Sequence, residues 1–219
     1  MTLAIFDLDN TLIAGDSDHL WGEFLCAQGL VDRDHFKAHN DAFYKAYGEG
    51  TLDIGAYLRF VLTPLVGKSL AEVNAWHKIF MADWIEPIIL KKAQELIDSH
   101  RQRGHTPIIV TATNTVVTAP IAHRFGIDWL LGCEVEIVNN RYTGLPTGVP
   151  SFQEGKVTRL REWAEQQQQT LAGAWFYSDS HNDLPLLEIV DNPVAVDPDS
   201  RLAARARERS WPILSLRSD

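Results

Sequence analysis

The N-terminal stretch that decides the fold is Leu3-Ala4-Ile5-Phe6-Asp7-Leu8-Asp9-Asn10-Thr11. Its four leading apolar residues are too few for a helix, and they predict a strand buried on both faces, as in a parallel sheet covered by helices. Side chains two residues apart on extended backbone point the same way, so Asp7 and Asp9 can share one cavity. Two carboxylates so close together repel each other unless a proton or a cation lies between them, and Mg²⁺ is the favoured cation. The alternative is a pair of solvated loop acids, with Thr11 as the cap of a following helix.

The composition is that of a globular chain, with 219 residues of which 45% are hydrophobic and 22% are charged. The net charge of -9 argues against a nucleic-acid partner, because phosphate backbones are bound by clustered Lys and Arg. No apolar stretch is long enough to cross a bilayer and no basic region precedes the first apolar run, so we expect no membrane partner and a cytoplasmic location. Cys26 and Cys133 lack the spacing of a metal site, and we expect two reduced thiols.

The sheet pattern is interrupted after Thr11. The next buried strand is predicted at residues 107–110, about a hundred residues further on, although a parallel crossover needs only about 30 residues. Residues 16–86 instead show helical periodicity, with one apolar stripe at Leu20, Trp21, Phe24 and Leu25. We therefore expect a helical unit inserted directly after the acidic strand end, which it can cover as a lid.

Two further residues lie where a functional group is expected. Thr111 follows the strand at 107–110 and precedes a predicted helix, where a hydroxyl and free backbone N–H groups can hold an anion. An N-cap role is the alternative. Lys156 opens an amphipathic helix, where its charge opposes the helix dipole unless an anion lies nearby. A surface position is the alternative for this lysine.

A third buried run, at residues 174–177, also ends in acids, Asp179 and Asp183. In open parallel sheets the groups that do chemistry gather at the carboxyl ends of the strands. We therefore expect these two acids to converge with Asp7 and Asp9. Between the second and third runs, the sequence predicts a hairpin near Asn139-Asn140 and then a loop over residues 144–150.

Together these residues resemble the haloacid dehalogenase-like (HAD) phosphatases. The segment from Asp7 to Thr11 is similar to the first family motif, Thr111 to the second, Lys156 to the third and Asp179-x-x-x-Asp183 to the fourth. The resemblance implies an α/β fold, in which residues 1–15 and 87–219 form a Rossmann-like three-layer core with a parallel sheet. Residues 16–86 would form an inserted helical cap of the C1 type. This cap resembles that of subgroup IB, which includes phosphoserine phosphatases and some histidinol-phosphate phosphatases.

The resemblance also implies a role for each group. Asp7 would attack phosphorus to form an aspartyl-phosphate, and Asp9 would protonate the leaving alcohol and later activate water. Because a phosphate dianion repels a carboxylate, both partners must be neutralised, here by Mg²⁺ and Lys156. The expected metal ligands are Asp7, Asp9 through its backbone carbonyl, Asp179, and Asp183 either directly or through water. The expected substrate-binding residues are Thr11, Asp16, Arg59, Thr111, Asn114, Lys156 and Asn182.

The segment around Arg59 resembles the part of phosphoserine phosphatases whose arginine binds the substrate carboxylate, and Asp16 stands where those enzymes have a glutamate for the ammonium group. However, residues 111–114 depart from their Ser-Gly-Gly motif, and Asp16 is shorter than glutamate. We expect a small amine-bearing phosphomonoester, and prefer L-histidinol phosphate over phosphoserine. Asp18, Glu23 or a cap aromatic could accommodate its imidazole. Arg59 would then contact phosphate or an acid of the cap, and the alternative is an exposed helix residue.

The expected partner is thus a small phosphate ester, and the chain is expected to be a monomer or a homodimer. A receiver-like signalling domain, phosphorylated on an aspartate, is the alternative from another class. The long insertion argues against it, because a receiver needs an open face for its partner.

Overall fold

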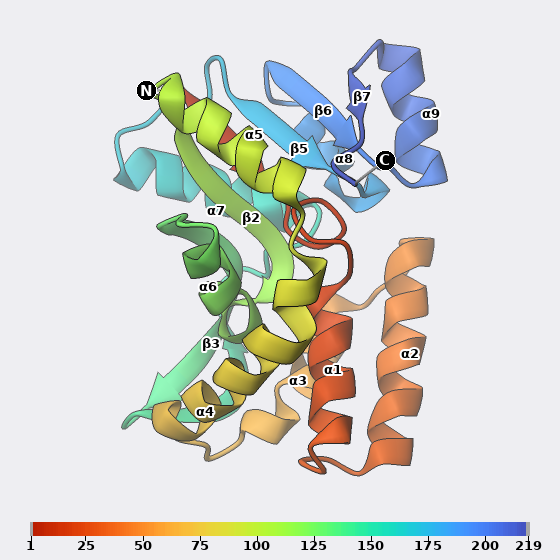
Figure 1. Ribbon diagram of the computed structural model, residues 1–219, viewed down its shortest axis with the longest axis vertical. Helices are drawn as coiled ribbons and strands as arrows, with labels where there is room; N and C mark the ends of the chain where they lie inside the picture. The colour runs from red at the N-terminus through yellow and green to blue at the C-terminus, as the bar shows by residue number, and fades with distance from the viewer. Residues whose placement is uncertain (1, 218–219) are drawn as a thin grey trace.

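The computed structural model describes residues 2–217, in which one seven-stranded sheet lies between two layers of helices (Figure 1). The strand order is β4-β3-β2-β1-β5-β6-β7, and every neighbouring pair is parallel except β3 and β4. The strands are β1 (Leu3–Phe6), β2 (Thr106–Asn114), β3 (Trp129–Val138), β4 (Arg141–Thr147), β5 (Trp175–Ser178), β6 (Asn192–Val196) and β7 (Ile213–Leu214). The acidic strand end therefore lies at the middle of the sheet, and the predicted α/β class is confirmed.

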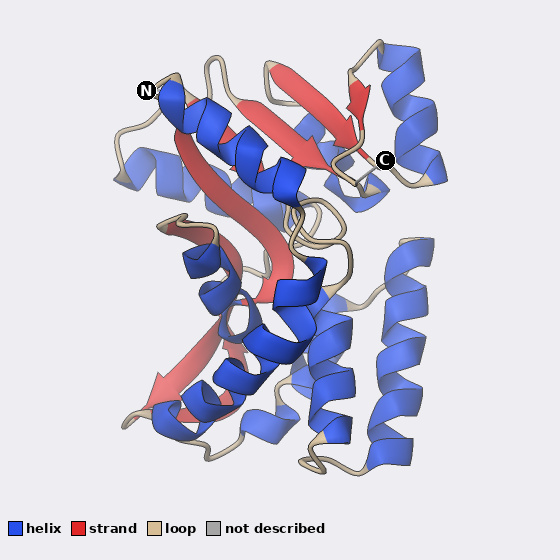
Figure 2. Cartoon of the chain, viewed as in Figure 1, coloured by secondary structure: helices blue, strands red, loops and turns tan. Residues whose placement is uncertain are grey.

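All the named elements between β1 and β2 are helical (Figure 2). Those that begin within residues 16–86 are α1 (Ser17–Ala27), α2 (Arg33–Glu49), α3 (Ile54–Val61), η1 (Thr63–Leu65), α4 (Leu70–Phe80), η2 (Met81–Ile85) and η3 (Glu86–Ile88), and we call them the inserted helices. The remaining helices are α5 (Lys91–Gln102), α6 (Thr115–Arg124), α7 (Glu154–Gln166), η4 (His181–Asp183), α8 (Leu184–Leu187) and α9 (Ser200–Arg209). The insertion is helical, as its periodicity predicts.

The two faces of β1 belong to two separate cores, because successive side chains of a strand point to opposite sides. Ala4 and Phe6 pack in a cluster with α1, α5 and α6, whereas Leu3 and Ile5 pack in a cluster with α7, α8 and α9. All four side chains are fully buried. This double burial explains why β1 is a continuous apolar run rather than an alternating one.

The inserted helices extend away from the centre of the sheet and pack on the β3–β4 hairpin (Figure 1). Leu58, Val61 and Leu62 of this segment share a buried cluster with Val135 of β3 and Tyr142 of β4. The division of the chain at residues 15/16 and 86/87 stays a prediction.

Two local predictions are corrected by strand pairing. Residues 144–147, predicted as loop, belong to β4, because Pro146 and Thr147 pair with β3. The strand predicted at residues 107–110 runs on to Asn114, which pairs with Cys133 of β3.

Both cysteines are free and buried, as expected. Within residues 2–217, no helix combines the length and the apolar character that crossing a membrane requires. The location of the protein stays a prediction.

We predict that Gly22→Ala destabilises the protein by about 1–3 kcal/mol, because α1 and α2 lack room for a methyl group at this point. A Cβ atom at Gly22 would lie 2.5 Å from Nδ2 of Asn40, whose amide is held by hydrogen bonds to the carbonyl oxygen and Nδ1 of His19. Urea unfolding measures the loss. The control is Gly48→Ala in α2, which meets no atom within 4 Å and should leave stability unchanged or slightly higher. Equal stabilities of the two variants would contradict this packing.

Candidate active site

Asp7 lies directly after β1, and its carboxylate is paired with a lysine that is far from it in the sequence. The Nζ atom of Lys156 donates to Oδ1 of Asp7 at 2.8 Å and lies 2.7 Å from Oδ1 of Asp183. The side chains of all three residues are at most 4% exposed. Burial raises the pKa of Asp7 to about 7 in spite of the nearby ammonium. Burial opposes the charge of Lys156, but the carboxylates of Asp183 and Asp7 prevail and raise its pKa.

The start of α7 is shaped to place this lysine. Gln153, just before the helix, has a positive φ of 48°, which turns the chain sharply. The backbone at Gly155 approaches Pro150 so closely that a Cβ atom there would collide with the carbonyl oxygen of Pro150. Glycine is therefore required next to Lys156, as a close backbone approach demands.

Thr11 connects the turn after β1 to the turn after β5. Its hydroxyl accepts a hydrogen bond from the backbone N–H of Asp179 at 3.1 Å and donates to Oδ1 of the same residue at 3.3 Å. Burial, and then the charge of Asp7, raises the pKa of Asp179 well above its ordinary value. Ser178 donates to Asp183 at 2.7 Å. The acids that follow β1 and β5 thus lie together, as expected from a parallel sheet.

Asp9 is oriented by two donors. The backbone N–H of Ser17 donates to one carboxylate oxygen at 2.6 Å, and the hydroxyl of Thr113 donates to the other at 2.8 Å. Burial, and then the charge of Asp16, raises the pKa of Asp9 to about 6. A group with this pKa can both give and take a proton near neutral pH. Thr111 is fully buried, lines the same cavity as Asp9, and its hydroxyl accepts a hydrogen bond from the backbone N–H of Thr113 at 3.2 Å.

A cavity opens beside these groups and is roofed by the inserted helices. Its lining residues from the strand ends and from the start of α1 are Asp7, Asp9, Asp16, Asp18, His19, Thr111, Ala112 and Thr113. The lining residues from further along the insertion are Asn40, Phe43, Tyr44, Tyr47, Leu52, Ile54 and Tyr57. Among the described lining residues none is Lys or Arg, so the wall combines acids with aromatic rings.

Four of the expected substrate-binding residues have distinct local roles. Asp16 lines the cavity and caps α1 through hydrogen bonds from the backbone of Asp18 and His19. Asn114 caps α6 and is buried. Asn182 is also buried, and instead joins the core to α2 by donating to the carbonyl oxygen of Tyr47. Arg59 is exposed and is not among the cavity-lining residues, so the structure does not bring it to the other predicted groups.

Several residues that line the cavity are not identified as site residues by the sequence. The aromatic residues of the insertion come from different helices, and helical periodicity marks them only as core residues. Thr113 carries a signal that was available in the sequence, since it is a second hydroxyl residue two positions after Thr111, close to the predicted strand end.

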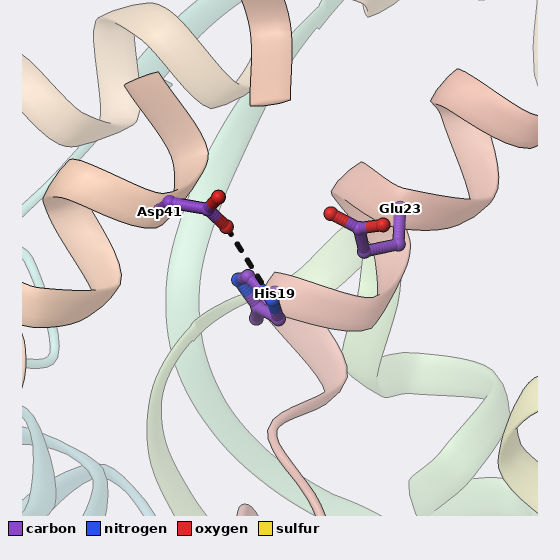
Figure 3. A group of neighbouring side chains, drawn as sticks. All are labelled: His19, Glu23 and Asp41. Carbon is purple, nitrogen blue, oxygen red and sulfur yellow. Dashed lines mark ion pairs between the residues drawn. The ribbon is translucent and has the colours of Figure 1, made fainter. Parts of the chain in front are cut away.

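A second group of possible metal ligands, His19, Glu23 and Asp41, lies on α1 and α2 (Figure 3). The imidazole of His19 is 3.8 Å from Asp41. However, the Nζ atom of Lys37 lies 2.7 Å from Glu23 and 3.3 Å from Asp41. Because a lysine already neutralises these acids, the group gives no support for a second metal centre.

Comparison with known proteins identifies the family. Residues 4–188 match the haloacid dehalogenase-like hydrolases, and the chain belongs to that family. A histidinol-phosphatase of Neisseria meningitidis serogroup C (strain 8013) is 45% identical over 98% of this chain and 99% of its own length. The phosphoserine phosphatase SerB1 of Mycobacterium tuberculosis (strain ATCC 25618 / H37Rv) is 33% identical over 98% of this chain and 70% of its own length.

The fold comparison agrees with the family. A solved structure of phosphoserine phosphatase with bound substrate has a TM-score of 0.71 at 17% identity, covering 100% of this chain and 94% of that one. The chain is therefore a phosphatase of the haloacid dehalogenase-like family, and the resemblance seen in its motifs is confirmed.

We predict that Lys156→Met lowers the free energy of unfolding of the metal-free protein by about 3–5 kcal/mol near pH 8, because it leaves buried carboxylates without their cation. Without the ammonium, the pKa of Asp7 rises above about 7. A carboxyl whose pKa is raised by folding stabilises the folded state below its unfolded pKa of about 4, and this contribution is lost as the pH rises through the folded value. The deficit should therefore shrink towards pH 5.

Urea unfolding with a chelator, from pH 5 to pH 8, measures this dependence. The control is Lys37→Met, which removes an exposed ion pair and should cost much less at every pH. If the loss of unfolding free energy in Lys156→Met did not change with pH, this would contradict the role of Lys156 as the cation of the buried carboxylates.

Proposed function

We propose that this phosphatase hydrolyses a small phosphomonoester that carries an ammonium group, with L-histidinol phosphate as the first choice, through an aspartyl-phosphate on Asp7. The observation that carries the choice of substrate is the acidic cavity wall. Asp16 and Asp18 line it beside Asp7 and Asp9, and no Lys or Arg is found among its described lining residues. A cationic substrate relieves the repulsion between these acids. The 45% identical relative bears the name histidinol-phosphatase, which supports the same choice.

Phosphoserine is the second candidate, because the relative SerB1 bears that activity in its name. Phosphoserine has a carboxylate as well as an ammonium group. The arginine expected to bind that carboxylate, Arg59, is exposed and lies outside the cavity lining. A carboxylate placed against the acidic wall would be repelled, which disfavours phosphoserine.

In the proposed reaction the carboxylate of Asp7 forms a bond to phosphorus, and the bond from phosphorus to the substrate oxygen breaks. Asp9 gives its proton to that oxygen, so the alcohol leaves neutral. Asp9 then takes a proton from water as the water attacks the aspartyl-phosphate, which releases phosphate and restores Asp7. A pKa of about 6 suits Asp9 for both steps. Lys156 and Thr111 hold the phosphoryl oxygens.

The acids at the strand ends suit a hard divalent cation such as Mg²⁺. The donor atoms available from Asp7, Asp9, Asp179 and Asp183 are oxygens, which such a cation prefers, and the single ammonium of Lys156 cannot balance all of these acids. When bound, Mg²⁺ supplies positive charge that lets the Asp7 carboxylate approach an anionic ester.

We predict that Asp7→Asn lowers phosphate release by at least about 10³-fold, because an amide cannot attack phosphorus. Lys156 keeps its partner Asp183 in this variant, so the thermal unfolding midpoint should stay close to that of the parent protein. Phosphate release with Mg²⁺ and thermal unfolding are measured on the same preparation. Substantial turnover by a well-folded Asp7→Asn protein would rule out this residue as the nucleophile.

We also predict that kcat/KM for L-histidinol phosphate exceeds that for phosphoserine by about 10²-fold or more, since like charges at close range cost several kcal/mol. The two esters are compared side by side with Mg²⁺ and with a generic aryl phosphate as reference. A preference for phosphoserine would overturn the substrate while leaving the phosphatase assignment intact.

A further inference from the structure

The carboxyl group of Asp18 lies at the junction of three helices. It belongs to the first turn of α1, it accepts a hydrogen bond from Nδ2 of Asn114 at the start of α6 at 3.3 Å, and the nearby hydroxyl of Tyr57 on α3 favours its charged form. Asp18 is 4% exposed and lines the cavity. It is therefore a buried acid at the wall of the candidate active site.

No role in the reaction at phosphorus accounts for this buried acid. Within residues 2–217, no ion pair joins Asp18 to a lysine, an arginine or a histidine. Burial raises its pKa well above the ordinary value, and the charges of Asp16 and Asp9 add to this effect. Burying a carboxyl without a counter-charge costs stability, so a ligand with a basic nitrogen is the natural partner.

Asp16, at the N-cap of α1, and Asp18, in its first turn, line the cavity together with Asp7 and Asp9. In L-histidinol phosphate the ammonium group is two carbons from the ester oxygen, and the ring nitrogens lie beyond it. The substrate thus carries two basic groups, and the cavity has two acids that no step at phosphorus uses.

The surroundings of Asp18 suit a flat ring. Tyr57, whose hydroxyl lies near it, lines the same cavity as Phe43, Tyr44 and Ile54. Aromatic walls favour a planar group, and they attract it more strongly when it carries positive charge. A buried acid at the end of such walls can bind the N–H of a heterocycle.

We propose that Asp18 is a specificity-determining residue that binds the ring N–H of the substrate's basic heterocycle, while Asp16 binds the ammonium group. This inference rests on the proposed function. It names the residue that makes the enzyme prefer an amine with a heterocyclic ring over an amine without one. Imidazole has a pKa of about 6.5, so an acid with a raised pKa and the ring share one proton. Either form of the pair retains an N–H···O or O–H···N hydrogen bond.

The test uses three esters: L-histidinol phosphate, its deamino analogue 3-(imidazol-4-yl)propyl phosphate, and the ringless amine 2-aminopropyl phosphate. Asp18→Asn should lower kcat/KM for both ring-bearing esters by about 10- to 100-fold, mainly through KM, because a charge-assisted hydrogen bond is lost. The loss for the ringless amine should be several-fold smaller. Asp16→Asn is the matched variant, and it should lower kcat/KM for the two esters with an ammonium group more than for the deamino ester.

Equal losses for all three esters with Asp18→Asn would overturn the proposal, since a merely structural role lowers them together. Tyr57→Phe provides a second test in case Asp18→Asn does not fold, because it removes only a hydroxyl group that favours the charged form of Asp18. Tyr57→Phe should also lower the ratio of kcat/KM for the ring-bearing esters to kcat/KM for the ringless amine. A ratio equal to that of the parent protein would contradict the proposal. Failure of the unmodified protein to hydrolyse L-histidinol phosphate would instead overturn the proposed function.

Discussion

The structure depends on one buried ion cluster, in which the ammonium of Lys156 lies between the carboxylates of Asp7 and Asp183. Withdrawing any one of these charges from water alone costs several kcal/mol, so the three groups are stable only as a unit. The cluster fixes α7 against the end of β1 and the turn after β5, three parts of the chain that are far apart in sequence. A lysine in the first turn of a helix is disfavoured by the helix dipole. The position of Lys156 in the first turn of α7 is therefore explained by its pairing with Asp7 and Asp183, and not by the preferences of the helix.

Lys156 can balance only part of the negative charge that the fold gathers at this edge of the sheet. Burial raises the pKa of each of the acids that remain, which are Asp9, Asp16, Asp18 and Asp179. Every cation that enters such a site removes repulsion that is present in the folded protein. The phosphate ester is itself an anion, so it is admitted only together with positive charge. The divalent metal and the substrate ammonium group that we propose would meet this requirement, because the metal would neutralise the reacting groups and the ammonium group the acids of the cavity wall.

The sheet and its acidic edge could be predicted because their signals are local. Asp7 ends a four-residue apolar run, and parallel strands bring such ends together whatever the intervening chain does. The strand at residues 144–147 could not be predicted, since only the pairing of Pro146 and Thr147 with β3 reveals this Gly- and Pro-containing segment as part of the sheet. Arg59 illustrates a second limit, because a helical segment is visible in the sequence whereas the direction in which each side chain faces is set by tertiary packing. The contact between Tyr57 and Asp18 has no sequence signal, since it joins two helices that neither spacing nor periodicity relates.

The contacts between the inserted helices and the sheet are made by residues at the cavity or next to it. Tyr57 on α3 and Asn114 at the start of α6 meet on the carboxyl group of Asp18, and Asn182 of the turn after β5 donates to the backbone of Tyr47 on α2. A ligand changes the position of one element relative to another only by the difference in its interactions with the two arrangements. Because Asp18 is hydrogen-bonded to Asn114 at the start of α6 and lies near Tyr57 of α3, a substrate that binds Asp18 as proposed would interact with the group at which the inserted helices meet the sheet. Under this proposal, recognition of the substrate and placement of the inserted helices over the strand ends would be linked through one side chain.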